Sequence, residues 1–184
     1  MRQIEKRRNL LVELINTAEK IRKKINIHRI VYILQQLGAP FEERFKYNYY
    51  GPYSPTLELE IDELVDINMI RVVESEPDVY TYTSTIKSST SFLSEYEPVI
   101  KFLATLPSHM LELVATLFYL KEWYGNNEKF LKSKLSILKS NLKQYFDEAF
   151  YLYYRLEESI YNFSYRDSHD ALAHGGICTE FKTT

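Results

Sequence analysis

Hydrophobic side chains recur at helical spacing in two stretches near the start of the chain. Residues 3–19 place Leu10, Leu14 and their apolar neighbours on one face, which predicts an amphipathic helix. Residues 27–37 repeat this pattern, and Gly38 directly after them is typical of a helix end. A short basic connection is expected between the two helices.

A rigid corner is predicted next, at residues 50–55, which read Tyr-Gly-Pro-Tyr-Ser-Pro. Gly51 permits a backbone conformation that other residues rarely adopt, and the two prolines restrict the turn. Ser54 is a suitable N-cap, with Pro55 at the first position of a third helix. This helix is expected to end near residue 67.

Two β-like runs, 69–73 and 79–83, then predict a hairpin. The rest of the chain has helical spacing in four segments, 89–104, 108–124, 127–140 and 141–163. We therefore expect a mainly α fold with a small β-hairpin. It would comprise a winged-helix-like N-terminal module (1–86), a helical bundle module (87–165) and a loose C-terminal tail (166–184).

The bulk composition is that of an ordinary globular protein. The chain has 184 residues, 45% of them hydrophobic and 26% charged, which is enough for a sizeable core. No apolar run reaches the roughly 20 residues that cross a bilayer, and the charged start is unlike a signal peptide. A single cysteine, Cys178, excludes an internal disulfide. We expect a cytoplasmic protein that does not contact the membrane.

The charge of the third predicted helix argues against its binding in the major groove of DNA. In winged helices this helix enters the major groove, where Arg, Lys, Asn or Gln contact the bases. Here it carries five acidic residues and no Lys or Arg, so phosphates would be repelled. We expect this surface to meet a protein partner instead, which could be a toxin, an effector or a second copy, in a homodimer or hetero-complex.

Aromatic side chains at the predicted corner add to this candidate surface. Rigidly held tyrosines make good anchors for a partner, although a tyrosine-lined turn can also be purely structural. The predicted partner-binding residues are Tyr49, Tyr50, Tyr53, Glu58, Asp62 and Glu63.

Basic residues gather in two other segments and leave nucleic-acid binding as an alternative. Residues 1–29 hold nine Lys or Arg against three Glu, and residues 129–143 hold five Lys and no acid. Such faces can contact phosphates, or they can be solvated helix surface. The residues assigned to this alternative are Arg7, Arg8, Arg22, Lys23, Lys24, Lys132 and Lys139.

Residues 23–54 resemble the YwgA family of bacterial and archaeal proteins. The resemblance rests on the helix His-Arg-Ile-Val-Tyr-Ile-Leu-Gln (28–35) and on Tyr-Gly-Pro-Tyr-Ser (50–54), and it covers about residues 10–85. The family is also distantly similar to Panacea or SocA-type antitoxin domains. This similarity implies an antitoxin or adaptor role, often beside phage-defence genes.

Catalytic and metal motifs are sparse. The sequence contains no phosphate-binding loop, no Gly-x-Gly-x-x-Gly and no His-Glu-x-x-His, so we expect a non-enzymatic protein without a cofactor or metal. One segment of the tail, Arg166 to His174, is similar to the Arg-polar-x-x-x-x-His signature of HEPN ribonucleases. Seven residues separate the pair here, longer than the usual four to six. An RNase using Arg166 and His174 is the second alternative.

Overall fold

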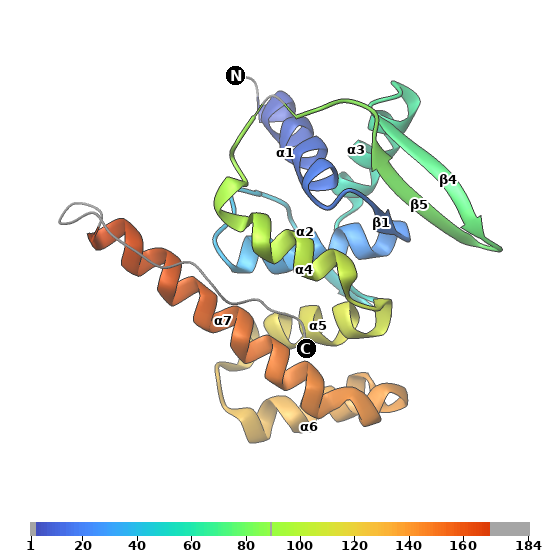
Figure 1. The fold of residues 1–184 in the computed structure, drawn as a ribbon. Helices are drawn as coiled ribbons and strands as arrows, with labels where there is room; N and C mark the ends of the chain where they lie inside the picture. The colour runs from blue at the N-terminus through green and yellow to red at the C-terminus, as the bar shows by residue number, and fades with distance from the viewer. Residues whose placement is uncertain (1–2, 89, 170–184) are drawn as a thin grey trace.

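The computed structural model describes residues 3–88 and 90–169 and is mainly helical with two small antiparallel sheets (Figure 1). Its N-terminal half contains α1 (Gln3–Thr17), α2 (Lys24–Gln36) and α3 (Pro55–Asp66). The fold class expected from the sequence is confirmed. Within the described residues, no helix combines the length and apolarity needed to span a membrane.

A three-stranded sheet has the order β1-β5-β4. Strands β4 (Ile70–Glu76) and β5 (Val79–Ser84) form the expected hairpin. Strand β1 (Ile21–Arg22) joins it, with Ile21 opposite Tyr82. The sequence predicted only a connection here, because two residues are too few to show an alternating pattern.

A second hairpin surrounds the predicted corner. Strand β2 (Lys46–Asn48) pairs with β3 (Gly51–Tyr53), and residues 49–50 form the tip between them. Gly51 has a φ of 108°, and a Cβ added there would meet no atom within 4 Å. The backbone angle, rather than a lack of space, therefore favours glycine at this turn.

Local capping defines the ends of α3 as the sequence predicted. The Ser54 hydroxyl accepts a hydrogen bond from the Leu57 N–H at 3.3 Å, and Pro55 occupies the first turn. After the helix, Asn68 has a φ of 57°, a left-handed conformation that is common where a helix ends. The rigid corner therefore leads directly into a well-capped helix.

The C-terminal half is mainly helical in its described residues. Helix α5 has the predicted bounds, and α7 runs beyond the predicted end at 163 and into the segment assigned to a loose tail. The elements are η1 (Ser94–Tyr96), α4 (Glu97–Thr105), α5 (Ser108–Tyr124), α6 (Glu128–Leu138), η2 (Ser140–Tyr145) and α7 (Phe146–His169).

Helix α5 joins the two halves of the molecule. It lies between α2 on one side and the α6–α7 pair on the other (Figure 1). Its buried residues, such as Leu113 and Leu117, belong to the same hydrophobic cluster as Ile30 and Leu34 of α2. The predicted modules therefore share one core.

Candidate functional site

The tip of the β2–β3 hairpin presents two tyrosines to solvent. Tyr49 is 80% exposed and Tyr50 is 59% exposed. Their rings meet edge to face, with centroids 5.2 Å apart, and the Asn48 side chain accepts a hydrogen bond from the Tyr50 N–H at 2.9 Å. We call residues 49–53 the tyrosine corner.

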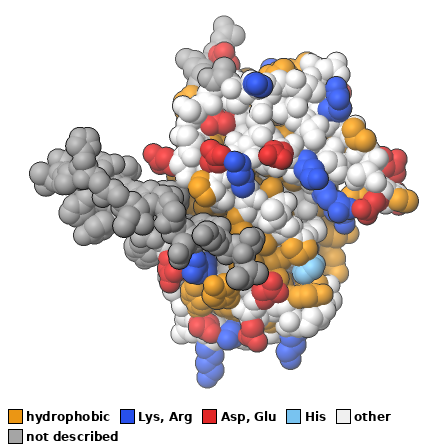
Figure 2. Space-filling view, in the orientation of Figure 1, with side chains coloured by type: hydrophobic (Ala, Val, Ile, Leu, Met, Phe, Trp, Pro, Cys, Tyr) orange, Lys and Arg blue, Asp and Glu red, His pale blue; other side chains and the backbone are white. Residues whose placement is uncertain are grey.

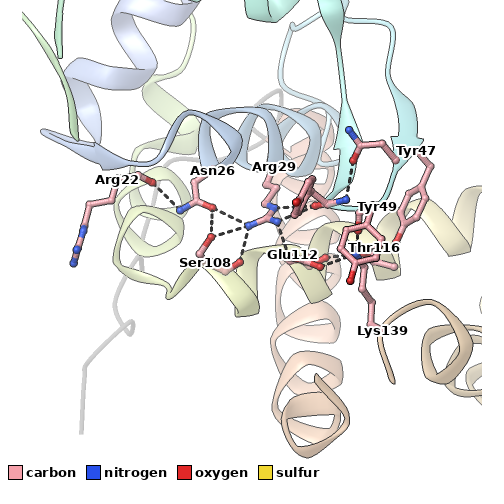
Figure 3. A network of polar contacts seen from close by, with 11 residues as sticks. Arg22, Asn26, Arg29, Tyr47, Tyr49, Ser108, Glu112, Thr116 and Lys139 are labelled. Atoms are coloured by element: carbon pink, nitrogen blue, oxygen red, sulfur yellow. Dashed lines mark hydrogen bonds and ion pairs between the residues drawn. The ribbon is translucent and has the colours of Figure 1, made fainter. Parts of the chain in front are cut away.

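Two buried cations hold the backbone of the tyrosine corner from beneath (Figure 3). Arg29, on α2, is 2% exposed and donates from Nη2 to the Tyr50 carbonyl at 2.8 Å. Lys139, which follows α6, is also buried and donates from Nζ to the Tyr49 carbonyl at 2.6 Å. Both carbonyls of the tip are thus fixed by charged donors.

One carboxylate links these cations. Glu112, on α5, accepts from Arg29 Nη2 and from Lys139 Nζ, at 2.6 Å each. Burial lowers the pKa of the Arg29 guanidinium, and the charge of Glu112 opposes this shift. Arg29 Nη1 also donates to Asn26 and Ser108. Arg29, Glu112 and Lys139 form what we call the buried triad, and it connects α2, α5 and the end of α6 to the hairpin tip.

His28, on α2, supports the base of the corner and is fully buried. Its ring stacks on Tyr53, with centroids 4.8 Å apart. Nδ1 accepts a hydrogen bond from the Ser54 N–H at 3.3 Å, so Nε2 carries the proton and donates to Glu58 at 2.9 Å. Desolvation lowers the pKa of His28, which favours this neutral form. Tyr53 is therefore half-buried and structural as well as adjacent to the exposed pair.

The predicted acidic partner surface has partners within the chain. Lys24 Nζ lies 2.9 Å from a Glu58 oxygen and 2.5 Å from an Asp62 oxygen. Arg8 Nη2 lies 2.5 Å from a Glu63 oxygen. The basic N-terminal segment thus neutralises much of the charge on α3. In Figure 2, acidic and basic side chains are interspersed over the drawn face rather than separated into opposite halves.

Most of the other basic residues predicted to contact nucleic acid also form ion pairs within the chain. Within the described residues, Lys23 is the exception, since it forms no ion pair. The remaining pairs are Arg22 with Glu76 at 2.7 Å, Lys132 with Glu128 at 2.8 Å, Lys139 with Glu112, and Arg7 with Glu43 and Glu60.

Two buried carboxylates converge on Arg7. Its Nε lies 2.9 Å from Glu43 and 3.2 Å from Glu60. Burial raises the pKa of Glu60 to about 7; Arg7 counteracts this rise and the charge of Glu43 adds to it. Glu43 also accepts from the Ser54 hydroxyl at 3.0 Å, so this cluster adjoins the N-cap of α3.

The catalytic pair considered from the sequence falls partly outside the described residues. Arg166 lies within α7 and His174 lies outside the described residues, so the arrangement of this pair stays a prediction. Among the residues the structure describes, no three or more His, Cys, Asp or Glu side chains gather as metal ligands would.

A comparison with known proteins finds one relative that covers most of the chain. The uncharacterized protein YwgA of Bacillus subtilis (strain 168) is 26% identical over 152 residues, which cover 76% of this chain and 89% of YwgA. This similarity supports membership of the YwgA family, at a distance. No family model matches this chain. No solved structure matches it either.

The sequence predicted the tyrosine corner but not the buried triad beneath it. Arg29 interrupts an apolar stretch of α2, and Glu112 interrupts the most apolar stretch of α5. Lone charges on buried helix faces usually have a partner, because an unpaired buried charge is costly. The two lone charges could therefore have predicted that α2 packs against α5. Nothing in the sequence around Lys139 predicts that it joins them.

Proposed function

We propose that this YwgA-family protein is a non-catalytic regulatory protein, of antitoxin or adaptor type, that acts in the cytoplasm by binding a protein partner at the tyrosine corner. The observation that carries the proposal is a pair of exposed tyrosines on a backbone that buried charged groups hold in place. Tyr49 and Tyr50 project from a tip whose carbonyls are held by Arg29 and Lys139. A rigid anchor loses little conformational entropy when it binds, which favours affinity.

Apolar side chains near the corner extend this surface. Ile137 and Leu138 are exposed and directly precede Lys139, whose ammonium lies 5.7 Å from the centre of the Tyr49 ring. Exposed aromatic and aliphatic groups that lie together are typical of protein interfaces. Tyrosine is also enriched among the residues that contribute most binding energy.

The charges of α3 support a secondary role at the rim of the same interface. Asp62 and Glu63 keep about half of their side chains exposed although both are ion-paired. Charges of this kind affect the rate of encounter and the orientation of a partner more than the affinity. The winged-helix arrangement we infer for the N-terminal half would leave α3 free of DNA, since its surface has no excess of positive charge.

The test is quantitative affinity capture with three baits: the wild-type chain, Tyr49→Ala/Tyr50→Ala, and Tyr80→Ala/Tyr151→Ala. The last is a matched control, because Tyr80 and Tyr151 are exposed at other sites. We expect one stoichiometric partner that the control retains and the corner variant loses. Each anchor tyrosine should contribute about 2 kcal/mol, or about thirtyfold in affinity.

Reconstitution with the purified partner, and light scattering of the chain alone, then separate a different protein from a second copy. A folded corner variant that keeps every partner of the wild type would refute the proposal. So would a wild-type chain that captures no partner and is monomeric.

A further inference from the structure

A second set of aromatic side chains leads from β2 along α5, away from the tyrosine corner. The Tyr47 ring stacks on Tyr119 with centroids 4.6 Å apart, and Tyr119 lies 6.2 Å from Trp123. Trp123 is 66% exposed near the end of the helix. The next residue in the chain, Tyr124, is also exposed, as is Phe130, and their ring centroids are 5.1 Å apart. Flat rings are thus open to solvent where α5 turns into α6.

Lysines accompany these rings. Lys134 Nζ lies 5.3 Å from the centre of Tyr124 and 5.2 Å from that of Phe130. Lys129 is exposed one residue before Phe130. In the described part of the chain neither lysine forms an ion pair with a carboxylate, unlike Lys132 and most cations of the N-terminal segment. Positive charge therefore remains available at this turn.

We propose that this basic–aromatic surface, formed by Trp123, Tyr124, Lys129, Phe130 and Lys134, binds single-stranded nucleic acid. Bases stack on exposed aromatic rings whatever their sequence, while ammonium groups contact the phosphates between them. A duplex offers no unpaired base to stack on the rings. An acidic peptide would satisfy the lysines but leave the flat indole of Trp123 unused.

This site is separate from the one proposed for a protein partner. Glu112, beneath the tyrosine corner, and Trp123 are eleven residues apart on the same helix, a rise of about 16 Å. Each surface can therefore be altered alone, so the failure of one proposal leaves the other standing.

The chain contains one tryptophan, which makes Trp123 a built-in reporter. We expect titration with oligo(dT) or oligo(U) to quench its fluorescence saturably at low salt. Affinity should fall with rising salt, with a logarithmic slope of about −0.7 for each phosphate contact. A duplex of equal length should leave the fluorescence nearly unchanged.

Variants then assign the contacts through the anisotropy of a labelled oligonucleotide. Trp123→Ala and Lys129→Glu/Lys134→Glu should each weaken binding about tenfold or more. The charge-matched control is Lys20→Glu/Lys87→Glu, which alters two exposed lysines of the N-terminal half and should leave affinity unchanged.

Three results would overturn the proposal. The first is an absence of oligonucleotide binding at low salt. The second is equal binding of duplex and single strand without fluorescence quenching. The third is equal loss of affinity in the Lys20/Lys87 control, which would indicate a general charge effect.

Discussion

Glu60 is a carboxylate on the inner side of α3, with Arg7 on one oxygen and no hydrogen-bond partner for the other among the described residues. Burial raises its pKa from 4.5 to about 7. Between these values the folded chain holds a proton that the unfolded chain has released. Its contribution to the free energy of unfolding therefore falls as the pH rises from about 4.5 to 7, and it then stays constant.

Replacing this group isolates the effect. Glu60→Gln should remove that fall, so the variant gains stability relative to wild type as the pH increases from 5 to 8. Urea unfolding at four pH values measures the difference between the two proteins. His28 contributes the opposite slope, because its lowered pKa makes the folded chain release a proton that the unfolded chain keeps. The slope due to His28 is the same in wild type and in the Glu60 variant. Parallel plots of stability against pH for the two proteins would therefore contradict the assignment to Glu60.

At the scale of elements, the junction between β3 and α3 depends on Ser54. Its hydroxyl accepts from the Leu57 N–H and donates to the buried Glu43, and its side chain is fully enclosed. Loss of an N-cap alone costs about 1 kcal/mol. Loss of a donor to a buried carboxylate adds to that cost.

Asn127 provides the comparison. It is exposed, and its side chain caps α6 by accepting one hydrogen bond, from the Phe130 N–H. Ser54→Ala should lower the free energy of unfolding by about 2 kcal/mol or more, and Asn127→Ala by about 1 kcal/mol. Chemical denaturation of both variants measures the difference. Equal losses would mean that the Ser54–Glu43 bond contributes nothing.

Sequence patterns identified the elements whose signals are local. The apolar periodicity of α5 and the cap at Ser54 were sufficient, because each depends on neighbours within one or two turns. Strand β1 was missed because it forms only by pairing with β5, about 60 residues further along the chain. The ion pairs between α3 and the N-terminal segment were missed for the same reason. Opposite charges in two segments show no pattern until the fold brings them together.

For the whole molecule, the buried triad stabilises the packing of α2 on α5. Removing the shared carboxylate would leave Arg29 and Lys139 as two buried cations without a counter-charge. Breaking a buried ion pair in this way costs about 3 to 5 kcal/mol. We expect Glu112→Ala to lose that amount, measured by urea unfolding.

The matched control is Glu122→Ala, on the same helix. Glu122 is exposed and accepts one hydrogen bond from Tyr32, so its loss should cost about 1 kcal/mol. A Glu112 variant no less stable than this control would show that the triad does not hold the two halves together.

Lys139 reaches the Tyr49 carbonyl from 90 positions further along the chain. A protein truncated after the β4–β5 hairpin would therefore keep both exposed tyrosines and yet lack Lys139, one of the two cations that hold the tip. It would also carry a guanidinium on α2 deprived of Glu112 and Ser108. Shorter versions of this protein are thus poor substitutes for the intact chain in any search for what it binds.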